Sequence, residues 1–172
     1  MKRIGFALLI SAVLAGCAAP THRIQYKASP TKIENQIDFI EASISPDCTS
    51  WGCESFTLFV RNKSEKTIEI NWNKTLFLSY GQSSGGFMFE GVVYRDRNAS
   101  KSPDVVFSNG TLSKTIWPNN LVEFTSGKYG GWKHNNMPSG NIGVYLTVTM
   151  DGKDFSQKMT TNVSAEQVAI PK

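Results

Sequence analysis

The chain has 172 residues, of which 40% are hydrophobic and 19% charged, and its formal net charge is +4. This composition is typical of a folded globular protein and excludes an intrinsically disordered chain. The lysines and arginines form no basic stripe along the sequence, so nucleic acid is not indicated as a partner. The length suits a single domain.

The first residues have the layout of an export signal. Lys2 and Arg3 precede an apolar run over residues 4–13. About ten apolar residues suit a signal peptide but fall short of the ~20 needed to span a bilayer. The run ends in Leu14-Ala15-Gly16-Cys17, which resembles the lipobox of bacterial lipoproteins. A plain cleaved signal followed by an unrelated cysteine is the alternative.

The resemblance to bacterial lipoproteins implies an anchor and a location. It implies that residues 1–16 are a signal peptide, that the chain is cut before Cys17, and that fatty acids such as palmitate are attached there. The next residue is Ala18 rather than aspartate, which resembles the class sorted to the outer membrane. We therefore expect a domain tethered to the membrane through lipid on Cys17 and facing the periplasm. Loss of Lys2 and Arg3 lowers the 18 basic residues to 16, against 14 acidic ones, for a net charge of +2.

Three cysteines are present, and assigning Cys17 to lipid leaves Cys48 and Cys53. Export implies an oxidising compartment, where an even pair of cysteines predicts a disulfide. Closing so short a loop stabilises the fold by only ~2 kcal/mol on the chain-entropy model. The two histidines, His22 and His134, lie far apart in sequence, so no zinc site is indicated.

Residues 17–32 contain two prolines and no sustained apolar period, so they predict a tether ahead of a domain formed by residues 33–172. An alternating pattern then changes phase between residues 37 and 40, which suggests a bulge or a crossing between sheets. Residues 56–60 and 68–72 both alternate apolar with polar side chains. They predict two half-buried strands joined as an antiparallel hairpin.

Further strands are predicted over residues 75–80, 87–94 and 121–124. Asn109-Gly110 and Asp151-Gly152 are strong hairpin signals. They predict pairing of residues 105–107 with 112–116 and of 142–150 with 153–161, and one helical turn is weakly indicated near residue 164. Roughly seven to nine short strands predict an all-β antiparallel sandwich, immunoglobulin-like or transthyretin-like, with a small barrel as the alternative.

The loop over residues 126–140 is rich in glycine, asparagine and aromatic residues, a composition typical of binding loops. Its candidate binding residues are Tyr129, Trp132, His134 and Met137. The alternative is that Trp132 folds back and caps one end of the sandwich. Trp72 and Trp117 fall on or beside strand patterns and are expected to serve in packing.

The sequence contains no paired-carboxylate site, phosphate loop or metal cluster, so we expect no enzyme activity, catalytic residue, metal or cofactor. The anchor, the tether and the aromatic loop together favour an accessory subunit that binds another protein of the cell envelope. Two alternatives are an exclusion or immunity lipoprotein carried by a phage or plasmid, and a module that binds glycan or peptide.

Overall fold

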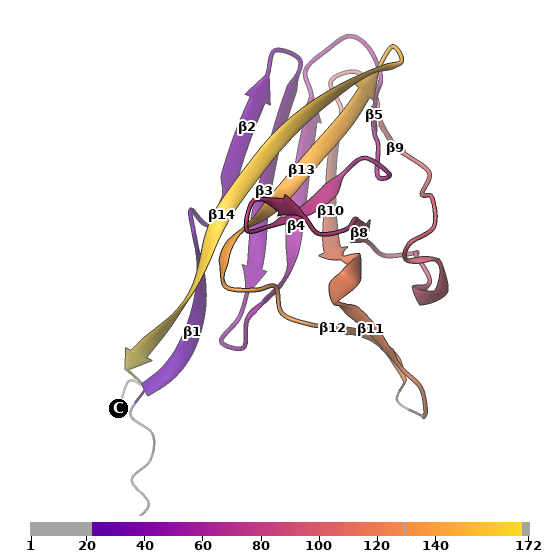
Figure 1. Cartoon of the computed structure of the whole chain (residues 1–172). Helices are drawn as coiled ribbons and strands as arrows, with labels where there is room; N and C mark the ends of the chain where they lie inside the picture. Colours follow the sequence, from indigo (N-terminus) through magenta and orange to yellow (C-terminus); the bar gives the residue numbers. More distant parts are fainter. Residues whose placement is uncertain (1–21, 129, 170–172) are drawn as a thin grey trace, which may run out of the picture.

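Two antiparallel β-sheets packed over a shared core account for most of the chain (Figure 1). The computed structural model describes residues 22–128 and 130–169. The predicted all-β antiparallel sandwich is confirmed. Fourteen strands occur in the described residues instead of the expected seven to nine, because several short strands lie in segments expected to be loops or tether. No helix in these two ranges is long and apolar enough to cross a membrane.

The first sheet has the long strands β13 and β14 at its centre. In spatial order it contains β1 (His22–Ser29), β14 (Lys153–Ala169), β13 (Gly140–Met150), β5 (Ile68–Ile70) and β9 (Asp104–Val106). In addition, β13 pairs with β6 (Leu76–Ser79), which pairs with β7 (Gln82–Ser83).

The second sheet covers the other side of the core, and a small third sheet follows it in the chain. The second sheet contains β2 (Ile33–Ile37), β3 (Ile40–Cys48), β4 (Cys53–Asn62), β10 (Thr111–Pro118) and β8 (Phe87–Met88) in spatial order. The third consists of β11 (Val122–Thr125) and β12 (Gly131–His134). The 3-10 turn η2 (Asn119–Leu121) directly precedes β11, and η1 (Tyr94–Asp96) lies between β8 and β9.

The core forms where the apolar positions of the alternating strands face each other between the two sheets. Phe56 and Leu58 of β4 are completely buried, as are Val144 and Leu146 of β13. Successive side chains of a strand point to opposite faces, so the polar residues between them face outward. Burial of a large apolar side chain contributes about 1.5–3 kcal/mol, which makes this interior the main source of stability.

The predicted tether is wrong for its second half. Residues 22–29 form β1, which pairs with the end of β14 in the register His22↔Ala169 to Ser29↔Asn162. The domain therefore begins at least ten residues earlier than residue 33, and the weakly indicated helical turn near residue 164 is strand. Ile24, Tyr26 and Ala28 do alternate with polar residues, but β1 is an edge strand with little apolar surface. The expected tether residues 17–21 lie outside the described residues.

Two predicted hairpins are also wrong, because each was expected to pair strands that belong to different sheets. The strands at residues 56–60 and 68–72 belong to different sheets, and so do those on either side of Asn109-Gly110. Both connections cross from one sheet to the other. Asn62, completely buried between these crossings, donates from Nδ2 to the carbonyl oxygens of Lys66, Val106 and Phe107 at 2.7, 3.1 and 3.0 Å. Its amide thereby joins the two crossings.

Two local predictions have simpler outcomes. The phase change between residues 37 and 40 is a tight hairpin turn between β2 and β3, in the register Ile37↔Ile40. The Asp151-Gly152 hairpin is confirmed, since Met150 pairs with Lys153 and both turn residues have positive φ, 51° and 74°. Positive φ at both central positions is what a type I′ turn requires.

Candidate functional site

The disulfide turn, residues 48–53, confirms the predicted pairing of Cys48 with Cys53. The two cysteines are register partners at the ends of β3 and β4. The Thr49 N–H donates to the Gly52 carbonyl oxygen at 2.7 Å across the turn. Gly52 has φ of 148°, and a Cβ there would lie 2.1 Å from the Asn136 Cγ. The turn therefore requires glycine at this position, and it holds Trp51 outward with 81% of its surface exposed.

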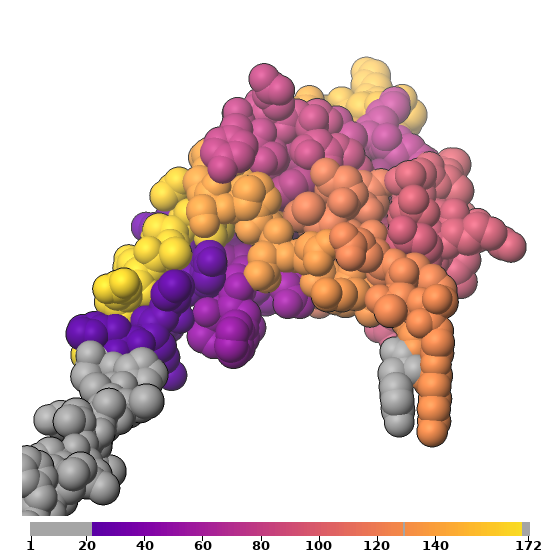
Figure 2. All heavy atoms as spheres, turned by 60° about the horizontal axis from the view of Figure 1, so that its bottom comes forward, coloured from indigo at the N-terminus to yellow at the C-terminus, as the bar shows by residue number. Residues whose placement is uncertain are grey.

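A second feature, which we call the aromatic groove, opens where three segments distant in sequence meet. Its volume is about 840 Å³, and its walls are Val93, Tyr94, Trp117, Phe124, Trp132 and His134. Glu90 and Arg95 add one acidic and one basic side chain to the same lining. The groove lies between the segment after β8, the end of β10 and the β11–β12 hairpin, which projects from the body on the side away from β1 (Figures 1 and 2).

The β11–β12 hairpin supplies one wall through its register. Phe124 pairs with Trp132, and Val122 pairs with His134. Directly opposed residues of an antiparallel pair share a face, and so do residues two positions apart along a strand. Phe124, Trp132 and His134 consequently face the same side of the hairpin. Phe124 is 54% exposed, so this wall presents a large apolar ring to the groove and to solvent.

The end of β10 supplies the floor. The imidazole of His134 stacks on the indole of Trp117, with centroids 4.8 Å apart and planes inclined by 11°. Trp132 meets His134 edge-on, with centroids 6.3 Å apart and an interplanar angle of 83°. Both are favourable aromatic geometries, worth about 0.5–1.5 kcal/mol each beyond area burial. The three rings thus form a packed unit that joins the hairpin to the second sheet.

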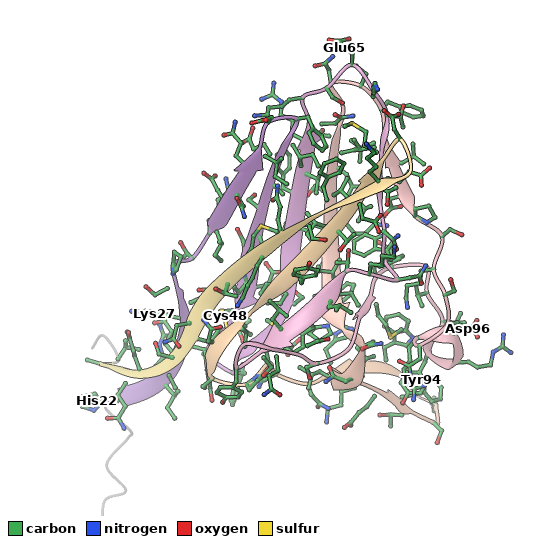
Figure 3. The ribbon with its side chains drawn as sticks, turned by 45° about the horizontal axis from the view of Figure 1, so that its top comes forward. His22, Lys27, Cys48, Glu65, Tyr94 and Asp96 are labelled. Atoms are coloured by element: carbon green, nitrogen blue, oxygen red, sulfur yellow. A yellow bond between two sulfur atoms is a disulfide. The ribbon has the colours of Figure 1, made fainter. Side chains whose placement is uncertain are left out.

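The segment after β8 supplies the opposite wall through η1. Tyr94 lies against Phe124 with ring centroids 5.7 Å apart. Arg97 places its guanidinium 4.2 Å from the centre of the Tyr94 ring, an attractive cation–π contact. Arg95 donates from Nε to Asp96 at 3.1 Å, and this hydrogen bond raises the pKa of the Arg95 guanidinium. Figure 3 shows Tyr94 and Asp96 together at this edge, across the molecule from His22 and Lys27.

His134 carries a buried polar atom. Its Nε2 makes no hydrogen bond among the described residues. A buried polar group without a partner costs about 1–3 kcal/mol. The atom has almost no exposed surface, so this cost falls on the free protein and the nitrogen is not open to a molecule in the groove.

Binding by the loop over residues 126–140 stays a prediction, and the structure places its described candidate residues differently. Trp132 and His134 do lie together in the aromatic groove, but on a β-strand instead of a loop. Met137 is wrong as a candidate: it is 3% exposed, packs in the core, and its N–H donates to the Cys53 carbonyl oxygen at 2.7 Å. Tyr129 and Cys17 lie outside the described residues.

Three aromatic residues of the groove, Tyr94, Trp117 and Phe124, were not among the candidates that the sequence indicated. Trp117 was expected to serve only in packing, and it does pack against His134, but its other surface lines the groove. Trp72, in contrast, is buried in the core as expected, with its Nε1 donating to Asp104 at 3.0 Å. The alternation of Val122 and Phe124 with polar residues marks a strand, but it does not reveal which segments the strand faces.

No model of a known protein family matches the chain, and no curated protein matches it with significance. Within residues 22–128 and 130–169, no group of three or more histidine, cysteine, aspartate or glutamate side chains could hold a metal ion. The aromatic groove and the disulfide turn are the two surface features of the described residues that we consider as functional sites.

Proposed function

We propose that this chain is a lipid-anchored, non-enzymatic binding module of the bacterial outer membrane, and that its aromatic groove holds an apolar segment of another envelope protein. The observation that supports this proposal is the convergence of Tyr94, Trp117 and Phe124 with Trp132 and His134 in one open groove. Aromatic residues and arginine are the residue types that dominate binding energy at protein interfaces.

The size of the groove favours a segment of several residues. Its volume of about 840 Å³ falls in the range of roughly 300–1,000 Å³ that is typical of binding pockets. The groove is open, and Val93 and Phe124 are both more than half exposed. Covering either side chain would contribute about 1.5–3 kcal/mol, so an apolar partner segment gains affinity directly from contact with them.

Polar groups in the same lining would give the site orientation and specificity. Glu90 offers an acceptor and Arg95 a donor. A protein segment brings backbone N–H and C=O groups as well as side chains. Such a segment can pair with these two side chains and bury apolar surface at the same time, which a purely apolar ligand cannot do.

The anchor in this proposal is fatty acid on Cys17, as the lipobox resemblance implies. An attachment of two or three acyl chains is stable, whereas one chain binds a membrane only marginally. His22, the first described residue of β1, is the fifth residue after Cys17. The groove would then stay near the outer membrane and face the periplasm, where envelope proteins are available as partners.

Photo-crosslinking in intact cells tests the proposed groove. A benzoyl-phenylalanine replaces Phe124, which is 54% exposed in the groove, or Phe107, which is 72% exposed. Phe107 precedes β10 and Trp117 is its next-to-last residue, so most of this eight-residue strand separates the control from the groove. We expect a discrete protein adduct from position 124 only, and loss of that adduct when Trp132→Ala is added.

Two outcomes would contradict the proposal. Identical adducts from positions 124 and 107 would show contact without selectivity, and an adduct unaffected by Trp132→Ala would exclude the groove as its source. Soluble cell-wall fragments are titrated in parallel against tryptophan fluorescence. A saturable change there, with no protein adduct, would favour the glycan-binding alternative. An adduct with a receptor or channel that imports foreign DNA or phage would favour the exclusion or immunity alternative.

A further inference from the structure

The exposed indole of Trp51 lies beside the first residues of β1. Trp51 and Ser50 line a shallow hollow of about 450 Å³ together with Arg23, Ile24 and Tyr26. Ile24 is 52% exposed. We call these five residues the Trp51 face. It is separate from the aromatic groove, because the two share no lining residue.

The disulfide turn holds Trp51 in this exposed position. Besides the Cys48–Cys53 bond, the Trp51 N–H donates to Thr49 Oγ1 at 3.1 Å, and Asn136 Nδ2 donates to the Trp51 carbonyl oxygen at 2.6 Å. The backbone of the turn is therefore fixed on both sides of the indole. An exposed aromatic side chain on a fixed backbone, next to the exposed Ile24 and to Tyr26, forms an apolar patch of the kind that marks a contact surface.

The chain ahead of β1 indicates what covers it. The five steps from Cys17 to His22 span at most roughly 18 Å when fully extended. If Cys17 carries lipid in the bilayer, the start of β1 cannot lie farther than this from the acyl chains. The headgroup region itself is about 5–7 Å thick on each side of the hydrocarbon. The start of β1, with the Trp51 face beside it, is therefore held within reach of the headgroups.

The chemistry of the Trp51 face matches a bilayer surface. Tryptophan and tyrosine are enriched at membrane interfaces, where an apolar ring and a polar N–H or O–H are both accommodated. Residues 17–33 contain Arg23, Lys27 and Lys32 and no acidic residue, which favours anionic headgroups. Lys27 is paired with Glu166 and Lys32 with Glu34, but Arg23 forms no ion pair within the described residues, so its charge is available to lipid phosphate.

We propose that the Trp51 face is a second membrane contact, in which the Trp51 indole inserts into the headgroup region of the same bilayer that holds the Cys17 lipid. This inference rests on the proposed anchor at Cys17. It also sets an orientation: the end with His22, Lys27 and Cys48 faces the membrane, and the end with Glu65 faces away (Figure 3). The β11–β12 hairpin is at the membrane-facing end too, on the other side of the molecule (Figures 1 and 2).

Fluorescence quenching by brominated lipids tests this contact. The full-length chain is produced with its signal, purified, and reconstituted into phosphatidylethanolamine–phosphatidylglycerol vesicles with or without bromine on the acyl chains near the headgroup. The parent is compared with Trp51→Phe and with the matched control Trp132→Phe. We expect bromine to quench the parent, Trp51→Phe to lose most of that quenching, and Trp132→Phe to keep it. Trp51 is exposed, so its replacement leaves the fold intact.

The other outcomes overturn the inference in distinguishable ways. Acylated parent that sits on vesicles without any quenching excludes the Trp51 contact and leaves the groove proposal standing. Quenching that is lost in Trp132→Phe instead of Trp51→Phe overturns both, because the groove would then face lipid. An intact mass without acyl groups removes the anchor, and with it both the proposed location and this contact.

Discussion

His134 stacks on Trp117 with their ring planes inclined by only 11° and their centroids 4.8 Å apart, while its Nε2 is buried without a partner among the described residues. The imidazole ring therefore stabilises the free protein by stacking as a flat surface, whereas burial of its unpaired nitrogen lowers the stability. This combination separates the packing role of the side chain from its polar role.

Replacing His134 with phenylalanine keeps a ring for stacking and removes the unpaired nitrogen. We expect His134→Phe to leave the free energy of unfolding unchanged or to raise it by about 1 kcal/mol. His134→Ala should lower it by about 1–2 kcal/mol because the stack is lost. Urea denaturation measures both. Equal destabilisation by the two variants would mean that the nitrogen already has a partner such as a bound water.

Gln157 is a second buried polar side chain without a partner, and here the sandwich interior surrounds it. It is 4% exposed, faces the same side of the sheet as its register partner Leu146, and neither Nε2 nor Oε1 is hydrogen-bonded within the described residues. Gln157→Met preserves the shape and removes the polar atoms, so we expect it to stabilise the fold by about 1–3 kcal/mol.

The matched control is Gln36→Met, at an exposed position of β2, which should change stability by less than about 0.5 kcal/mol. Thermal and urea denaturation of both variants make the comparison. A destabilising Gln157→Met would show that the amide is satisfied in solution, by water inside the sandwich.

Asn62 is the opposite case, a buried amide whose hydrogen bonds are all made. Its Oδ1 accepts from the Ser64 N–H at 3.0 Å and its Nδ2 donates to three carbonyl oxygens. Asn62→Ala would leave several buried backbone groups unpaired, so we expect a loss of about 3 kcal/mol or more. Asn73→Ala is the control, since Asn73 Nδ2 donates to the Lys101 carbonyl oxygen at an exposed site. Similar losses in both variants would contradict the role of Asn62 as the link between the two crossings.

Gly143 allows β13 and β14 to approach closely. A Cβ at this position would lie 2.1 Å from the Met159 carbonyl oxygen and 2.9 Å from the Thr160 Cα. Both obstacles are backbone, so Gly143→Ala should destabilise by about 1–3 kcal/mol or more, measured by thermal unfolding. Gly131→Ala has nothing within 4 Å of its Cβ and should be nearly neutral. A neutral Gly143→Ala would mean that β13 and β14 lie far enough apart at this position to accommodate a Cβ.

Removing the disulfide tests its contribution to the fold and to the Trp51 face. The double variant Cys48→Ala/Cys53→Ala should lose about 2 kcal/mol, the value for closing so short a loop. Reduction of the parent with dithiothreitol should produce a similar decrease in the midpoint of urea denaturation, and it adds no mutation. A loss near zero in both experiments would show that the hydrogen bonds of residues 49–52 hold the turn alone.

The sequence by itself determined the features that depend on neighbouring residues. Alternation identified β3, β4 and β13 as strands, the Asp151-Gly152 dipeptide marked one hairpin, and the even pair of cysteines left beside Cys17 predicted the bond between Cys48 and Cys53. These are local because side-chain alternation, turn geometry and short-loop closure are set within about ten residues.

Only the tertiary structure decided which strands share a sheet and which aromatic residues share a surface. The chain crosses between sheets after Asn62 and again before Gly110, where the local pattern is that of a hairpin. Tyr94, Trp117 and Phe124 meet in the aromatic groove although no spacing relates them. Pairing and convergence of this kind follow from how whole sheets cover a common core, and the burial energy that selects them sums contacts over the entire chain.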